Sequence, residues 1–239
     1  MTPLIRTRAG ARTIPIHGAR PFQFAWDLDH SALLVIDMQR DFLEAGGFGE
    51  QLGNDVSLLA AAVEPISRLL AAWRAWGLPV LHTQESHLAD LSDCHPAKRY
   101  RAPSGLRIGE HGPMGRILIR GEPGTGFIDA CRPVADEPVY NKPGKGAFYR
   151  TTLEHDLHAR AITQLILTGV TTEVCVQSTM REANDRGFDC LLLEDCTASY
   201  FPEYKEAVLE MVRAQGALIG WTAASSLLLD AGAAFFFDG

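Results

Sequence analysis

The sequence predicts an α/β fold of three layers, in which helices cover both faces of a central, mostly parallel sheet of about six strands. Two observations lead to this prediction. Short apolar segments typical of buried strands alternate along the chain with longer segments whose apolar residues recur at helical spacing. In addition, no internal repeat and no linker rich in Gly, Ser or charge divides the chain. Alternation of this kind is typical of βαβ units with right-handed crossovers, and hence of a doubly wound sheet.

Length, composition and charge exclude several classes of protein. The 239 residues, 46% of them hydrophobic, suffice for one large domain with a sizeable core. A formal net charge of -7, with acidic and basic residues interspersed, argues against nucleic acid or an anionic membrane as partner. We find no apolar run long enough to span a bilayer and no signal peptide, and therefore expect a cytoplasmic protein. Five cysteines without a Cys-x-x-Cys motif argue against a disulfide framework.

The individual elements follow from local patterns. We interpret residues 1–29 as an irregular N-terminal arm and residues 30–239 as a single domain, which opens with the apolar strand Ser31–Asp37. The other expected strands are 78–83, 137–140, 164–169, 188–193 and 217–221, and the expected helices are 57–76, 151–159, 173–186 and 203–215. Residues 84–136 lack periodicity and are rich in Gly, Pro and charge, which favours a functional lid or a subunit contact. The apolar tail ending at Phe237 offers a docking patch to a neighbouring subunit.

Three reactive side chains are placed at or just after the ends of predicted strands. Asp37 ends the first strand, Lys142 follows the strand that ends at Tyr140, and Cys175 opens the helix after the strand that ends at Gly169. In open parallel sheets, ligands bind beyond the carboxyl ends of the strands. We therefore expect an acid, a lysine and a cysteine to converge on one edge of the sheet, as in an activated-nucleophile site.

Each of these residues has a proposed role and a simpler explanation. Cys175 lies in the first turn of a helix, where free amide protons and the helix dipole favour a thiolate, and a nearby lysine would lower its pKa further. Asp37 is the candidate general base and later proton donor, and Lys142 would orient this acid and stabilise the thiolate. Taken singly, they could be a buried cysteine, a turn-capping aspartate and a solvated lysine. Their convergence favours the catalytic interpretation.

The segment before the nucleophile is a candidate oxyanion hole. Thr171 and Thr172 could merely cap the helix. Alternatively, the backbone N–H groups of Thr171 and Cys175 would stabilise a tetrahedral oxyanion. Such a hole needs an unusual local backbone, and a cis peptide at Val170–Thr171 would supply it.

Histidines near the end of the second strand raise the question of a metal site. His82, His87 and His95 lie close in sequence to Asp90 and Asp93. Their spacing matches no firm ligand motif. We therefore expect neither a metal nor another cofactor.

Longer segments of the chain resemble the isochorismatase-like cysteine hydrolases. The matching segments are 34–42, 142–146, 169–175, 179–187 and 191–195, and the resemblance runs from about residue 27 to about residue 230. It implies a catalytic triad of Asp37, Lys142 and Cys175, an oxyanion hole that includes the Thr171 amide, and usually a homotetramer. The nicotinamidase branch carries an Asp-x-His metal motif after the second strand. The corresponding segment here is Glu85-Ser-His87, which favours the metal-free branch.

Within this superfamily the short sequence motifs are most similar to those of the biuret hydrolases. The similar segments are 41–42 with 46–47, 112–118, 120–124 and 213–216. The resemblance implies that Phe42, Lys145 and Gln215 bind a small linear ureide. Lys145 also fits from the sequence, because it shares a Gly-rich turn with Lys142, whereas Gln215 rests on the resemblance alone. The expected partners are accordingly this ureide and water, and the expected reaction converts biuret to allophanate and ammonia through a covalent Cys175 intermediate. Triuret, ureidoacrylate and N-carbamoylsarcosine are alternative substrates.

Two further functions are weighed against this one. A vinyl-ether hydrolase acting on isochorismate needs no cysteine nucleophile, so the presence of Cys175 with a candidate base argues against it. A non-catalytic scaffold could inherit the same fold, because fold alone does not establish function. Alkylation of Cys175 faster than that of an ordinary cysteine would count against the scaffold.

Overall fold

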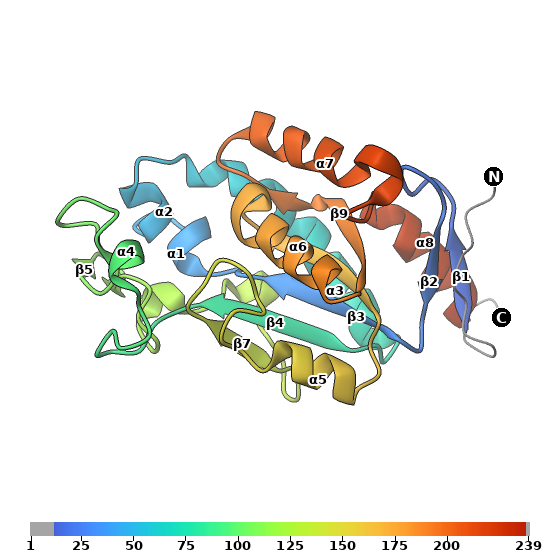
Figure 1. The fold of residues 1–239 in the computed structure, drawn as a ribbon, viewed down its shortest axis with the longest axis horizontal. Coiled ribbons are helices and arrows are strands. Elements are labelled where there is room, and N and C mark those ends of the chain that lie inside the picture. Colours follow the sequence, from blue (N-terminus) through green and yellow to red (C-terminus); the bar gives the residue numbers. More distant parts are fainter. Residues whose placement is uncertain (1–11, 238–239) are drawn as a thin grey trace.

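The computed structural model describes residues 12–237, and its largest sheet contains six strands (Figure 1). The strand order is β10-β9-β8-β3-β4-β7, and every pairing between neighbours is parallel. The strands are β3 (Ser31–Ile36), β4 (Val80–Glu85), β7 (Val139–Lys142), β8 (Gln164–Val170), β9 (Asp189–Ala198) and β10 (Trp221–Ala223). The predicted doubly wound α/β fold is confirmed.

Helices and short turns fill the connections between these strands. The helices are α1 (Arg40–Leu43), α2 (Phe48–Gln51), α3 (Val63–Ala75), α4 (Pro96–Arg99), α5 (Leu153–Ala159), α6 (Gln177–Asp185), α7 (Pro202–Ala217) and α8 (Ser225–Phe237). Three 3₁₀ segments span Val56–Ala62, Pro123–Thr125 and Asp129–Cys131, and a π turn spans Thr172–Val176. The π turn and α6 together occupy the single helix predicted over 173–186.

The sheet is buried on both faces, and β3 shows why. Because successive side chains of a strand point to opposite faces, Leu33 and Val35 pack into one hydrophobic cluster and Leu34 and Ile36 into another. The first cluster contains side chains of α3 and α8, and the second contains side chains of α5, α6 and α7. A strand buried on both faces reads as a continuous apolar run, and this is the pattern that identified β3 in the sequence.

The prediction of an irregular N-terminal arm is wrong for residues 13–16 and 24–27. These residues form an antiparallel hairpin of β1 (Thr13–Ile16) and β2 (Phe24–Asp27). Trp26 of this hairpin is fully buried and stacks on Trp73 of α3, with ring centroids 5.0 Å apart. The two strands are too short to show a period in the sequence, and the contact that buries them comes from a distant segment. Residues 1–11 of the predicted arm lie outside the described residues.

The C-terminal elements also differ from prediction. Helix α7 is interrupted by non-helical dihedral angles at residues 214–216, and the last strand covers 221–223 rather than 217–221. The apolar tail is the end of α8, where Phe236 stacks on Trp76 within the same chain. Phe237 is 71% exposed. Docking of this tail on another subunit therefore stays a prediction and would involve only part of it.

One helical stretch, Val56–Ala75, is long and apolar enough to cross a membrane by length and composition, contrary to our reading of the sequence. It joins a 3₁₀ segment to α3. Its residues Ile66, Leu69 and Leu70 are fully buried in the cluster that covers one face of the sheet. Burial against the sheet thus explains the apolar residues on the inner side of this stretch, of which about a third is buried.

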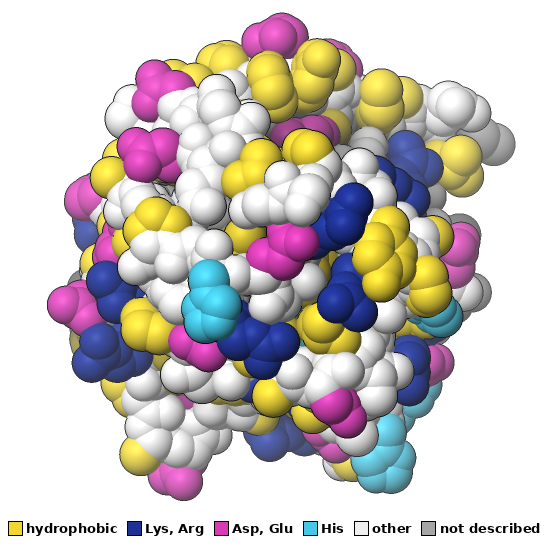
Figure 2. All heavy atoms as spheres, turned by 90° about the vertical axis from the view of Figure 1, so that its left-hand side faces the viewer, with side chains coloured by type: hydrophobic (Ala, Val, Ile, Leu, Met, Phe, Trp, Pro, Cys, Tyr) yellow, Lys and Arg dark blue, Asp and Glu magenta, His cyan; other side chains and the backbone are white. Residues whose placement is uncertain are grey.

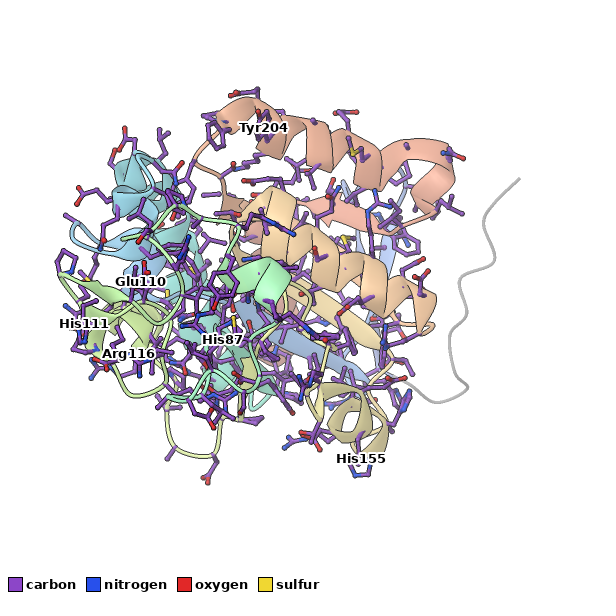
Figure 3. The ribbon with its side chains drawn as sticks, turned by 60° about the vertical axis from the view of Figure 1, so that its left-hand side comes forward. His87, Glu110, His111, Arg116, His155 and Tyr204 are labelled. Carbon is purple, nitrogen blue, oxygen red and sulfur yellow. The ribbon has the colours of Figure 1, made fainter. Side chains whose placement is uncertain are left out.

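The aperiodic segment 84–136 has a small hydrophobic cluster of its own. Cys94, Ile108, Ile117 and Leu118 pack together, and Phe42 and Phe48 pack against them. The segment also contains α4 and a short hairpin of β5 (His111–Gly112) and β6 (Gly115–Arg116). In Figure 3 the hairpin lies on the outer side of this segment, and His87 lies further inward, near α4.

Candidate active site

The structure brings Asp37, Lys142 and Cys175 together at the carboxyl edge of the sheet. Lys142 Nζ lies 2.7 Å from Asp37 Oδ2, and a carboxylate oxygen of Asp37 lies within 4.8 Å of Cys175 Sγ. Asp37 and Lys142 are fully buried, and Cys175 is 4% exposed. The convergence expected from the sequence is therefore present, and the catalytic roles of the three residues remain predictions.

Close backbone packing positions Asp37. Asp37 follows β3 with a φ of 51°, and the Oγ1 atom of Thr83 donates a 2.6 Å hydrogen bond to its Oδ1 atom. On the neighbouring strand, Gly169 has a φ of 112°, and a Cβ atom there would meet the carbonyl oxygen of Ile36 at 2.0 Å. Only glycine fits this position, because any side chain would collide with backbone next to the catalytic acid.

Glu85 is the main site residue that the sequence analysis did not identify. It ends β4, is fully buried, and its Oε2 atom accepts a 3.5 Å hydrogen bond from Cys175 Sγ. The nearest Glu85 oxygens lie 2.9 Å from Lys145 Nζ and 3.7 Å from Lys142 Nζ. The sequence signal was a carboxylate at the end of a parallel strand. It was missed because the predicted strand stopped at Thr83, two residues too early.

The aperiodic segment adds a third cation, Lys98 of α4. Its Nζ atom lies 2.8 Å from Glu85 Oε1 and donates a 2.6 Å hydrogen bond to the carbonyl oxygen of Pro143. It also lies 3.0 Å from Nε2 of His87. Segment 84–136 thus contributes directly to the site, and its role as a lid or as a subunit contact stays a prediction.

Burial reverses one electrostatic prediction. The pKa of the Cys175 thiol is raised well above its ordinary value, first by burial and also by Asp37 and Glu85, although Lys142 acts in the opposite direction. The helix dipole and a nearby lysine predict the opposite direction, a lowered pKa. The sequence does not show that the sulfur is enclosed and faces two carboxylates. The raised pKa favours the thiol form of Cys175 over the thiolate.

The lysine and the second carboxylate of the cluster are held in their charged forms. Burial opposes the charge of Lys142, but Asp37, Cys175 and Glu85 outweigh it and raise the Lys142 pKa. Burial likewise opposes the charge of Glu85, but Lys145, Lys142 and Lys98 hold its pKa well below the usual range. Lys142 thus pairs with Asp37, and Lys98, Lys142 and Lys145 surround Glu85, although burial lowers the pKa of Lys98.

The histidines suggested by sequence proximity do not form a cluster. His82 contacts Glu137 at 2.8 Å, His87 contacts Asp93 at 3.2 Å, and His95 contacts the hydroxyl of Tyr149 at 2.7 Å. These three partners hold the rings at separate places.

Another group of donors has a spacing that could suit a metal. Oxygens of Asp37 and Glu85 and the sulfur of Cys175 lie within 4.8 Å of one another. Ammonium groups already contact both carboxylates, at 2.7 Å for Asp37 and 2.8 Å for Glu85. These donors fit a metal poorly, because a metal ion would be repelled by the lysine ammonium groups or would have to displace them.

A cavity of about 230 Å³ opens onto the nucleophile. Cys175, Thr171, Lys145 and Phe42 all line it, so four of the predicted site residues surround one space. The Val170–Thr171 peptide beside it is cis, as predicted. The remaining lining residues are largely apolar or aromatic and include Phe48, Tyr200 and Phe201.

Gln215 is not among the residues that line this cavity. Helix α7 begins beside the cavity at Phe201 and runs away from the strand ends, so its interruption at Gln215 lies at the opposite end (Figure 1). Gln215 is exposed there, with a φ of 55°. Its position within one chain gives no support to the predicted contact with substrate.

The face of the molecule that carries α1, α2 and α4, on the left-hand side of Figure 1, has no broad area of a single charge. Figure 2 shows basic, acidic and hydrophobic side chains interspersed over this face.

Comparison with known proteins identifies the family. Residues 31–224 match the isochorismatase domain. The chain is 34% identical over 194 residues to the ureidoacrylate amidohydrolase RutB of Methylorubrum extorquens strain DM4, covering 80% of this chain and 77% of that protein. This chain belongs to the isochorismatase family. A fold of this family with a cysteine beside two carboxylates defines a hydrolase.

Solved structures agree with this assignment. A cysteine hydrolase from Pseudomonas syringae pv. phaseolicola 1448A has a TM-score of 0.75 at 23% identity, covering 88% of this chain and 96% of that one. At this identity the likeness shows the fold alone. The N-carbamoylsarcosine amidase of Thermoplasma acidophilum has a TM-score of 0.61 at 25% identity, covering 82% of this chain and 96% of that one.

Proposed function

We propose that this chain hydrolyses a C–N bond of a small linear ureide through a covalent Cys175 intermediate. The observation that carries the proposal is the buried cluster in which Cys175 Sγ contacts Glu85 and lies beside the Asp37–Lys142 ion pair, at the base of a small cavity. Such a cluster offers a nucleophile, a base and fixed cations beside a cavity that can hold a small substrate.

The proton of the thiol must move when the substrate binds, because the resting sulfur is protonated. Glu85 accepts the thiol hydrogen bond, but its lowered pKa makes it a weak proton acceptor. We therefore assign proton transfer to Asp37 and orientation of the thiol to Glu85. In this scheme Sγ attacks the carbonyl carbon as Asp37 takes the proton, and the charge on the carbonyl oxygen is stabilised by the N–H groups of Thr171 and Cys175.

The second half of the reaction uses the same groups. Asp37 returns its proton to the leaving nitrogen, the C–N bond breaks, and an acyl group remains on Cys175. Water then attacks the carbonyl carbon of this thioester or thiocarbamate and gives a proton to Asp37. The C–S bond breaks to release the acid product, and Asp37 passes the proton to the sulfur, which restores the thiol. With biuret as substrate, the products are ammonia and allophanate.

The substrate within the ureide class is a separate proposal. Relatives that match this chain include ureidoacrylate amidohydrolases, and a similar structure is an N-carbamoylsarcosine amidase. Both names describe compounds with a carbamoyl group, which supports a ureide as the substrate here. Biuret, on the resemblance of short segments, is the ureide that we propose first.

The test is ammonia release from chelator-treated enzyme offered biuret, triuret, ureidoacrylate, N-carbamoylsarcosine and nicotinamide in parallel. We expect turnover of at least one ureide, and its loss in Cys175→Ser. Cys131→Ser is the matched control, because Cys131 is also buried but does not line the cavity. Turnover of nicotinamide alone, or a Cys175→Ser variant of near-normal rate, would remove the proposal.

Location and assembly remain proposals as well. All five cysteines are free and buried, which supports a reducing cytoplasmic environment. A homotetramer is implied only by the family resemblance. Analytical ultracentrifugation of the full chain would measure its oligomeric state.

A further inference from the structure

Glu173 has no role in the chemistry described so far, although it lines the same cavity as Cys175. It lies two residues before the nucleophile, on the π turn Thr172–Val176. Its Oε2 atom is buried and has no hydrogen-bond partner within residues 12–237. No lysine, arginine or histidine in this described part of the chain forms an ion pair with it. An unpaired buried carboxylate oxygen is costly unless something else satisfies it.

The position of Glu173 near the start of a helix explains why the residue is acidic but not why its Oε2 atom is buried without a partner. An acidic residue in the first turn is favoured by the helix dipole. A carboxylate with that role alone is better placed in solvent, where water satisfies both oxygens. Here the side chain borders the cavity, which Tyr200 also lines. The pKa of Tyr200 is raised first by burial and then by the negative charge of Glu173.

The chemistry of a carboxylate determines what it can recognise. An ionised carboxylate only accepts hydrogen bonds, so its partner in the cavity must supply N–H or O–H groups. The one lysine that lines the cavity, Lys145, is held by both oxygens of Glu85 at 2.9 and 3.2 Å. Among residues 12–237, no other lysine or arginine lines the cavity, so a substrate with its own carboxylate would face Glu173 with only a cation already paired to Glu85.

We propose that Glu173 is a specificity-determining residue that binds N–H donors at the end of the substrate remote from the scissile carbonyl. This inference rests on the proposed function and narrows it. The substrate class is that of neutral ureides ending in an amide, such as biuret, and ureides ending in a carboxylate, such as ureidoacrylate, are disfavoured. The name of the 34% identical relative then does not carry over to this chain.

The kinetic test compares one neutral and one anionic substrate. Glu173→Gln keeps the size of the side chain and removes its charge. We expect kcat/KM for biuret to fall by about 10- to 100-fold, mainly through KM, because a hydrogen bond to a charged acceptor is lost. The value for ureidoacrylate should rise by about 10-fold, because a like charge is removed. Glu206→Gln, an exposed change on α7, is the charge-matched control and should alter neither value.

A binding test separates this inference from the proposed reaction. In the Cys175→Ser background, N-carbamoylglycinamide and N-carbamoylglycine differ only in a terminal amide or carboxylate. Ligand-observed NMR titration should show preference for the amide, and adding Glu173→Gln should abolish that preference. The amide preference can be observed even if no ureide is turned over, so failure of the proposed function is recognised separately.

Two results would overturn the assignment. One is an unchanged ratio of the two kcat/KM values, or of the two affinities, in Glu173→Gln. The other is an equal loss for both members of a pair together with a lower melting temperature, which would make Glu173 merely structural. Glu173→Asp keeps the charge and should retain the amide preference at reduced affinity, so a folding defect in Glu173→Gln does not leave the question open.

Discussion

The Oε2 atom of Glu85 lies 3.5 Å from Sγ of Cys175, so the nucleophile faces a second buried carboxylate in addition to Asp37. Glu85 is itself surrounded by Lys98, Lys142 and Lys145. Two carboxylates that lie near one thiol, each with its own lysine partners, can have different roles in the reaction. Variants that remove one charge at a time can therefore distinguish proton transfer from orientation.

Asp37→Asn and Glu85→Gln should impair the enzyme in different ways. Asp37→Asn removes the proposed base, and we expect kcat to fall by ~10²- to 10⁴-fold at every pH. Glu85→Gln should retain measurable turnover, and the alkaline limb of its kcat/KM profile should move to lower pH, because Glu85 raises the pKa of the Cys175 thiol. Steady-state rates between about pH 6 and 11 test this. An alkaline limb that moves to higher pH in Glu85→Gln would contradict the assignment.

Glu85→Gln should also destabilise the fold. Its removal leaves Lys98 and Lys142 buried with less compensation, and breaking a buried pair typically costs about 3–5 kcal/mol. Urea denaturation at neutral pH measures this loss. Glu206→Gln, an exposed substitution, serves as the comparison and should change the free energy of unfolding by less than about 0.5 kcal/mol.

Alkylation of Cys175 should be slow in the resting enzyme, because its pKa is raised and the thiolate is the reactive form. This reverses the expectation from sequence, and slow alkylation does not indicate a non-catalytic scaffold. Iodoacetamide labelling at neutral pH, followed by peptide mass spectrometry, gives the rate. We expect Glu85→Gln to react faster than wild type. Rapid labelling of the wild-type sulfur would show that it is a thiolate at rest.

Thr83 should position Asp37 through the 2.6 Å hydrogen bond that its hydroxyl donates. Thr83→Val keeps the shape but removes the donor, and a hydrogen bond to a charged group is worth about 1.5–3 kcal/mol, or roughly a 10- to 150-fold change. We expect a loss of this size in kcat with little change in KM. Thr83→Ser restores the donor and should recover most of the rate. Equal rates in the Val and Ser variants would exclude a positioning role.

Buried histidine should make stability fall on mild acidification. Burial lowers the pKa of His87 below 6.5, so between that lowered value and 6.5 the unfolded chain binds more protons than the native state. The free energy of unfolding therefore falls as pH decreases through this window, by up to about 1.4 kcal/mol per pH unit. His82 acts in the same direction. Asp41, whose pKa burial raises, acts in the opposite direction, so the comparison must be between variants.

His87→Gln tests this pH dependence, because it keeps an acceptor for Lys98 and cannot be protonated. Urea denaturation at several pH values should show a smaller slope in this variant than in wild type. His155→Gln is the control, because His155 is exposed on α5 and points away from the core (Figure 3). An identical slope in His87→Gln and wild type would rule out His87 as a source of the effect.

Much of the fold could be predicted because its sheet is buried on both faces. Apolar runs such as Ser31–Ile36 identify strands directly, and the rule that ligands bind at carboxyl strand ends places Asp37, Lys142 and Cys175 together. Among the elements that were missed, β1, β2 and α8 are short or uniformly apolar. Their burial depends on partners far away in sequence, such as Trp73 and Trp76.

The sequence by itself predicted the sheet and the convergence of Asp37, Lys142 and Cys175, because each depends on local pattern and chain topology. The tertiary structure decided the electrostatics. Only folding brings Glu85 against Cys175 and Lys98 against Glu85, encloses the sulfur, and raises the pKa of the thiol where a lowered pKa was expected. It also moves Gln215 away from the cavity and leaves Glu173 beside it. Burial and pairing of charges arise from long-range contacts, which no local pattern encodes.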